Sequence, residues 1–98
     1  MNYIVAIARD IRAQVSDDDL PDVDTDDLFL LYALLALVKG EGVDDADIHD
    51  AWTTWMALHD EDHPAMVPFA ELEPETQSQD TLFAEAVRHV AAKLRDRR

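Results

Sequence analysis

Residues 26–39 read Asp-Asp-Leu-Phe-Leu-Leu-Tyr-Ala-Leu-Leu-Ala-Leu-Val-Lys, and Gly40 follows them. Carboxylates at the start and a lysine at the end complement a helix dipole, and glycine often follows the last turn of a helix. Apolar side chains occupy every face of this predicted helix, so other segments must surround it or a second copy must cover it. The run is shorter than the roughly 20 residues that cross a bilayer. We therefore expect residues 26–39 at the centre of the fold.

Amphipathic helices are predicted on both sides of this segment. Residues 2–15 carry apolar side chains at three- and four-residue spacing. A third helix is expected after Gly42, with Asp44 as its N-cap and Asp47 at its third position. The apolar face of this third helix consists of Ile48, Ala51, Trp52, Trp55, Met56 and His59.

The last helix is predicted to begin at Pro74, because proline is suited to the first helical position. Arginines near its end favour the negative end of the helix dipole. The apolar stripe of this helix consists of Leu82, Phe83, Ala86, Val87, Val90 and Leu94. The arginines near its end are Arg95, Arg97 and Arg98.

Two aperiodic stretches separate the predicted helices. Residues 16–25 are rich in aspartate and predict an exposed loop, with Asp24 or Thr25 as the N-cap of the central helix. Residues 60–75 hold three of the four prolines, and four apolar side chains there are expected to pack the loop down. They are Met66, Val67, Phe69 and Leu72. We predict a single compact all-α domain over residues 1–98, with about four helices and an ordered proline-containing loop before the last one.

Composition excludes several classes of site. The 98 residues contain no cysteine, which excludes a disulfide framework, a thiolate zinc site and a cysteine nucleophile. Residues 1–4 show no basic stretch leading into an apolar run, so we expect no signal peptide. The expected location is the cytoplasm of a bacterium or of a phage-infected host cell.

The net charge is −14, and it is unevenly distributed. Between Ala13 and Val87, Lys39 is the single cation beside all of the 22 carboxylates except Asp10 and Asp96. Such a surface repels the phosphates of nucleic acids and of anionic lipids, so we expect no direct binding to nucleic acid or membrane. A basic protein partner and simple solubility are the two remaining explanations of the charge.

Two short patterns suggest metal chemistry. Residues 22–26 begin like a calcium-binding loop, but the glycine and glutamate that such a loop needs later are missing. His49-Asp50 matches the core of a metal-dependent phosphohydrolase motif, for which 98 residues leave little scaffold. A half-buried histidine beside the Trp52 face is the simpler interpretation of His49.

A third pattern places His59 and His63 on either side of three carboxylates. Two imidazoles one helical turn apart are able to hold a divalent metal, but Pro64 disfavours helical backbone at His63. No phosphate-binding glycine loop or serine nucleophile motif occurs in the sequence. We therefore expect no enzymatic activity, no bound metal and no cofactor.

Residues 48–90 resemble the RyR domain, a small helical repeat named after ryanodine receptors and also found in bacterial and phage proteins. Residues 48–52, Ile-His-Asp-Ala-Trp, are similar to the His-Glu-x-x-Trp of its first helix. Residues 63–72, His-Pro-Ala-Met-Val-Pro-Phe-Ala-Glu-Leu, are similar to its loop His-Pro-x-Leu-Val-Pro-Tyr-x-x-Leu. The RyR-like block spans about residues 43–95, and the whole chain looks like small proteins of actinobacteria and their phages.

This resemblance implies a function in recognition. RyR domains are regarded as interaction or ligand-recognition units rather than enzymes, with nucleotide-like ligands suggested in bacterial settings. The candidate site, which combines the resemblance with the neighbouring aromatic position, is His49, Trp52, Trp55, His63, Pro64, Pro68 and Phe69. Aromatic residues at helical spacing form either a stacking pocket or ordinary core, and both interpretations stay open.

We therefore expect a non-enzymatic recognition module, monomeric or homodimeric, that binds a protein partner or a small planar ligand. The alternative is an acidic protein of phage or host interaction that occupies the basic, nucleic-acid-binding surface of a partner.

Overall fold

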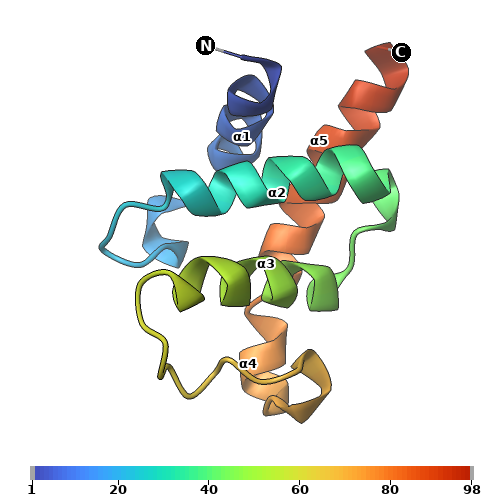
Figure 1. The fold of residues 1–98 in the computed structure, drawn as a ribbon. Helices are drawn as coiled ribbons and strands as arrows, with labels where there is room; N and C mark the ends of the chain where they lie inside the picture. The colour runs from blue at the N-terminus through green and yellow to red at the C-terminus, as the bar shows by residue number, and fades with distance from the viewer. Residues whose placement is uncertain (1, 98) are drawn as a thin grey trace.

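The central helix of the computed structural model is α2, which spans Asp26–Lys39 as predicted (Figure 1). The structure describes residues 2–97, and within them it contains helices and loops but no strand. The all-α prediction is therefore confirmed. The α-helices are α1 (Tyr3–Ala13), α2, α3 (Asp45–Ala57), α4 (Pro74–Ser78) and α5 (Thr81–Arg97), and the single-turn 3-10 helices are η1 (Asp17–Asp19), η2 (Gly40–Gly42) and η3 (Phe69–Glu71).

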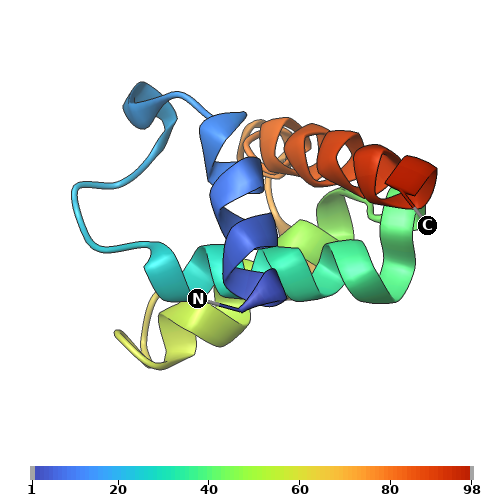
Figure 2. The ribbon, with the colours of Figure 1, turned by 90° about the horizontal axis from the view of Figure 1, so that it is seen from above.

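Helices α1, α3 and α5 all pack against α2. Viewed from above, α1 crosses over α2 at a steep angle, and α5 lies beside both (Figure 2). The side chains of α2 that these helices bury are Leu28, Phe29, Tyr32, Ala33 and Ala36. Burying them together with the rest of the core favours folding, because removal of apolar surface from water is the dominant driving force.

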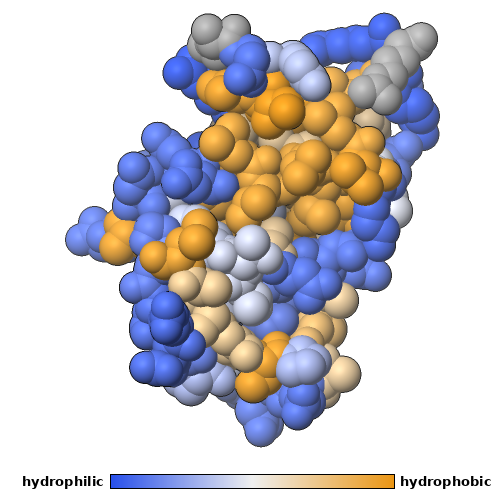
Figure 3. All heavy atoms as spheres, in the orientation of Figure 1, coloured by the Kyte–Doolittle hydropathy of each residue, from blue (hydrophilic) through white to orange (hydrophobic). Residues whose placement is uncertain are grey.

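One face of α2 stays uncovered. Leu34 is 49% exposed and Val38 is 71% exposed, and apolar side chains gather on this face of the molecule (Figure 3). The expectation that neighbouring segments surround α2 on all sides is therefore wrong for the chain taken alone. The alternative, that a second copy covers this face, stays a prediction.

Local hydrogen bonds explain where the helices begin. The Asn2 side chain accepts a hydrogen bond from the backbone N–H of Val5 at 2.9 Å, which caps α1. Asp44 is the N-cap of α3 as predicted, and together with Asp47 it forms a reciprocal capping box with bonds of 2.9 and 3.0 Å. For α2, Thr25 is the N-cap residue without a side-chain bond, and Asp24 accepts from the N–H of Asp26 instead.

Gly40 ends α2 with φ 57° and ψ −132°. Residues that carry a Cβ atom rarely adopt this backbone conformation. Replacing Gly40 by alanine is expected to lower the free energy of unfolding by about 1–3 kcal/mol through backbone strain. The matched control is Gly42→Ala, because an added Cβ meets no atom within 4 Å at either position and only Gly40 has a positive φ. Gly42→Ala is expected to be neutral or stabilising by up to about 1 kcal/mol. Urea denaturation of both variants tests this, and equal destabilisation would contradict it.

The last predicted helix is in fact two helices. Pro74 begins the short helix α4, and the N–H of Asp80 then bonds to the Gln77 carbonyl at 3.2 Å, which tightens the backbone into a turn. The Gln77 side chain donates to the Phe69 carbonyl at 2.9 Å, which attaches α4 to η3. This break places Asp80 at the start of α5.

Two smaller differences from the sequence-based expectations concern the end of α3 and the acidic loop. Helix α3 ends at Ala57, so His59 lies beyond it and is exposed rather than on its apolar face. The loop of residues 16–25 contains the single turn η1. Arg98, expected near the end of the last helix, lies outside the described residues. Among residues 2–97, no helix is both long enough and apolar enough to span a membrane.

Candidate functional site

A pocket of about 670 Å³ lies between α2, α3, the start of α5 and the loop of residues 16–25. Its volume is within the range of about 300–1,000 Å³ that is typical of small-molecule sites. Segments far apart in sequence therefore meet around one cavity. The ring-bearing side chains that line it are Tyr32, His49, Trp52, Trp55, His63 and Phe83.

His49 is the buried histidine of this pocket, with 4% of its surface exposed. Its Nε2 lies 2.6 Å from the backbone carbonyl of Val67. Because a carbonyl only accepts, Nε2 carries the proton and donates. The ring stacks on Trp52 with centroids 5.6 Å apart and contacts Phe69 at 6.2 Å. His49 thus joins α3 to the proline-containing loop.

The proline-containing loop is held against α3 by a second histidine. The His63 ring meets the Trp52 ring edge-on, with centroids 5.1 Å apart, and His63 Nδ1 accepts the N–H of Ala65 at 3.1 Å. Pro64 and Pro68 are exposed, so they restrict the loop backbone without lining the pocket.

Trp55 forms part of the buried wall. It is 3% exposed, and its indole Nε1 has no hydrogen-bond partner among the described residues. The His59 ring lies 4.8 Å from it, centroid to centroid. A buried polar atom without a partner costs free energy, typically about 1–3 kcal/mol, and such atoms often mark functional positions.

Asp80 is the more buried of the two carboxylates that line the pocket. Its side chain is 15% exposed, and its Oδ2 lies 3.9 Å from His49 Nδ1. Burial raises the pKa of Asp80 to about 6, the His49 ring opposes this shift, and the Asp45 carboxylate adds to it. The hydroxyl of Thr81 donates to Asp45 at 2.6 Å, which holds the second carboxylate in place. Burial and the Asp80 charge also raise the pKa of Tyr32, so the Tyr32 phenol stays protonated.

The raised pKa makes Asp80 a source of pH-dependent instability. The folded protein retains the Asp80 proton up to a pH of about 6, whereas the unfolded chain releases it near its ordinary value of 3.8. Stability from this group is therefore present below about pH 4 and is lost as the pH rises through 6. We expect Asp80→Asn to raise the free energy of unfolding by about 1–2 kcal/mol at pH 7.5, discounted for partial solvation, and by progressively less toward pH 4.

Urea denaturation of both proteins between pH 4 and pH 7.5 measures this difference directly. Asp10→Asn, an exposed position on α1, is the control and is expected to show almost no pH-dependent difference. A constant difference between Asp80→Asn and the unmodified protein over this range would contradict the raised pKa.

The structure brings together part of the candidate site predicted from sequence. His49, Trp52, Trp55 and His63 line the pocket. Phe69 packs on His49 behind the wall. The exposed prolines, 64 and 68, do not line it.

Sequence reasoning missed other lining residues. The sequence indicates Tyr32 and Phe83 only as apolar residues of their helices, and their rings lie 5.7 Å apart at the pocket. Asp80 follows the polar run Gln77-Ser78-Gln79, where nothing in the pattern marks one residue as buried. Leu20, from the acidic loop, was read as part of an exposed segment.

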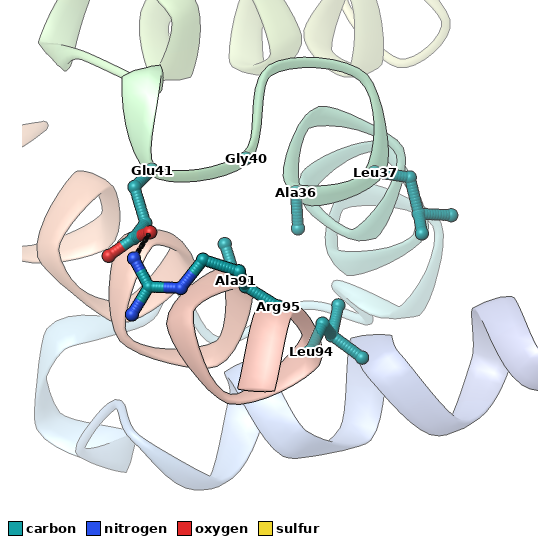
Figure 4. A pocket seen from close by; sticks show the side chains of 7 residues that line it. All are labelled: Ala36, Leu37, Gly40, Glu41, Ala91, Leu94 and Arg95. Carbon is teal, nitrogen blue, oxygen red and sulfur yellow. Dashed lines mark hydrogen bonds and ion pairs between the residues drawn. The ribbon is translucent and has the colours of Figure 1, made fainter. Parts of the chain in front are cut away.

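Neither the predicted metal patterns nor a second cavity gives a stronger site. Within residues 2–97, no three histidine or acidic side chains are grouped so as to hold a metal ion. A smaller pocket of about 300 Å³ lies between η2 and α5 (Figure 4). The ion pair between Arg95 and Glu41 lies at this pocket. Arg88 donates to the Val43 carbonyl at 2.8 Å. These contacts attach η2 and the following residue to α5, which is a structural role.

Comparison with known proteins identifies the family of this chain but does not indicate an activity. No curated protein and no solved structure matches the chain. A family model described as a domain of unknown function, DUF7701, matches residues 2–92. Because this match covers nearly the whole chain, the protein belongs to the DUF7701 family.

Proposed function

We propose that this domain is a non-enzymatic recognition module that binds a small planar ligand in the pocket between α2, α3 and α5. The observation that carries the proposal is the aromatic lining of a cavity of about 670 Å³. Rings from α2, α3, α5 and the proline-containing loop surround it. A flat molecule is the shape that such a lining accommodates best, because aromatic rings interact favourably when stacked or edge-to-face.

The arrangement of the pocket supports binding without rearrangement of its walls. Trp52 is partly exposed, so part of its surface is available to a ligand. The His49 ring stacks on the Trp52 ring and the His63 ring packs against it edge-on, with centroid distances of 5.6 and 5.1 Å. A side chain that is already immobilised loses little conformational entropy when a ligand binds. Trp52 is thus a pre-organised platform.

Recognition suits the pocket better than catalysis. Nucleophilic catalysis requires a hydroxyl or thiol hydrogen-bonded to a base. The imidazole Nε2 of His49 is occupied by the Val67 carbonyl. The lining hydroxyls belong to Tyr32 and Thr76, and among the described residues neither forms a hydrogen bond to His49. The hydroxyl of Thr53 lies 3.4 Å from His49 Nε2, but Thr53 does not line the pocket. The histidine therefore serves to position the wall.

The proposal predicts that ligand stabilisation depends on Trp52. A ligand at ten times its Kd stabilises a folded domain by about 1.4 kcal/mol, which raises the Tm of a domain of this size by roughly 5 °C. A thermal-shift screen of planar heterocycles, arylamines, nucleosides and nucleotides is expected to yield at least one such compound. The shift is expected to disappear in a folded Trp52→Ala protein.

Leu58→Ala is the matched control, since Leu58 directly follows α3 and is 78% exposed. This variant is expected to keep the full ligand-induced shift. A compound that stabilises Trp52→Ala as much as the unmodified protein would show that it binds elsewhere, and a screen without any stabilising compound would count against the proposal.

A further inference from the structure

Apart from two histidines, the ionisable groups of the pocket lining that carry charge at neutral pH are carboxylates. Asp19 and Asp80 are the charged residues among the lining side chains, and neither lysine nor arginine is among them. Arg12, the cation nearest to the acidic loop in sequence, is bonded to Asp17 and to the Val15 carbonyl. Lys39 is bonded to Asp47 at 2.8 Å. The cations on either side of this part of the chain are thus paired outside the pocket.

The Asp80 carboxylate has an incomplete set of partners. Its closest opposing group is His49 Nδ1 at 3.9 Å, which is longer than a hydrogen bond. Its other charged neighbour is Asp45, which repels it. Among residues 2–97, no hydrogen bond to the Asp80 side chain is formed. Asp80 thus lines the cavity as a mostly buried carboxylate whose capacity to accept hydrogen bonds is unused by the described residues.

Aromatic side chains stand beside this carboxylate. Tyr32, Trp52 and Phe83 line the same cavity as Asp80. The faces of aromatic rings attract cations, most strongly where water is excluded. A pocket lined by carboxylates and by several aromatic rings is complementary to a positive charge spread over a flat molecule.

From this combination, and resting on the proposed function, we infer that the ligand is a small planar organic cation. Its charged nitrogen pairs with the Asp80 carboxylate, and its ring system packs against the aromatic lining. The net charge of −14 and the aspartates of residues 17–27 favour the approach of such a molecule. The same charges oppose nucleotides, because phosphate groups would enter a pocket without a lysine or arginine.

The test compares three probes that share one ring system and differ in charge. At pH 7.5 and 150 mM salt these are 9-aminoacridine, a cation, acridine, which is neutral, and acridine-9-carboxylate, an anion. Asp80 is mostly ionised at this pH, given its pKa of about 6. Binding is followed by calorimetry and by the fluorescence of Trp52 and Trp55, which are the two tryptophans of the chain.

We expect 9-aminoacridine to bind at least about 10-fold more tightly than acridine, because its positive charge forms a charge-assisted hydrogen bond with Asp80. Acridine-9-carboxylate is expected to bind most weakly. Asp80→Asn is expected to weaken binding of the cation by about 10-fold and to leave acridine unchanged. Asp10→Asn removes the same charge at an exposed position of α1 and controls for general attraction to an acidic surface. It is expected to change the affinity by less than about 2-fold, because exposed charges are screened at this salt concentration.

Different outcomes separate this inference from the proposed function. Equal or tighter binding of acridine or of the carboxylate, lost in Trp52→Ala, would overturn the cation preference and leave the pocket as a planar-ligand site. An equal effect of Asp80→Asn and Asp10→Asn would also overturn it, since the charge would then act only from a distance. Absence of binding by all three probes would count against both proposals.

Discussion

Replacing Trp55 by alanine is expected to lower the free energy of unfolding by about 3–5 kcal/mol. Trp55 is 3% exposed and belongs to the same buried cluster as Ile48 and Ala51. Its removal would open a cavity in the wall that α3 shares with α2 and α5. A domain of this size typically has about 5–15 kcal/mol of stability in total, so the variant is expected to be marginally folded at 37 °C.

Urea denaturation followed by circular dichroism measures this loss. Leu58→Ala, three residues further along the chain, is the control and is expected to change stability by less than about 0.5 kcal/mol because it is 78% exposed. A loss below about 1 kcal/mol for Trp55→Ala would show that this indole is not packed as the structure has it.

The second large effect is expected at His49. His49→Ala removes the donor to the Val67 carbonyl, the stacking on Trp52 and the contact with Phe69. Loss of a buried ring together with an unsatisfied carbonyl is expected to cost about 2–4 kcal/mol. The effect should be concentrated in residues 58–73, where amide hydrogen exchange is expected to accelerate more than in α1.

His49→Gln separates the hydrogen bond from the ring. A glutamine side chain carries an N–H donor that is able to reach the Val67 carbonyl, but it cannot stack as imidazole does. His49→Gln is expected to lower the free energy of unfolding by about half as much as His49→Ala does. Uniform acceleration of exchange over the whole chain in His49→Ala would contradict the specific role of His49 in holding the proline-containing loop.

The parts of the fold that could be predicted from sequence depend on neighbours a few residues apart. The Asp44 and Asp47 capping box and the Gly40 terminus are local patterns, and both occur where they were expected. The aromatic wall is also local in part, because His49, Trp52 and Trp55 follow one another at three-residue spacing on α3. Such spacing places side chains on one face of a helix.

The remaining features depend on contacts between distant segments. Helix α2 is apolar on all faces, so its sequence does not indicate which side stays exposed, and only packing leaves Leu34 and Val38 uncovered. Asp80 becomes a pocket residue because the chain breaks between α4 and α5 and returns to His49. No pattern within residues 77–80 encodes that approach.

The central claim, that the aromatic pocket receives a planar ligand, is tested most directly by nuclear magnetic resonance. A titration of ¹⁵N-labelled protein with 9-aminoacridine follows two indole N–H signals, one each from Trp52 and Trp55, because the chain has only these two tryptophans. We expect both signals and the Asp80 amide to shift and to saturate together, while the amide of Arg9 on α1 stays unchanged. Unchanged indole signals, with non-saturating shifts spread over the exposed aspartates, would contradict the account.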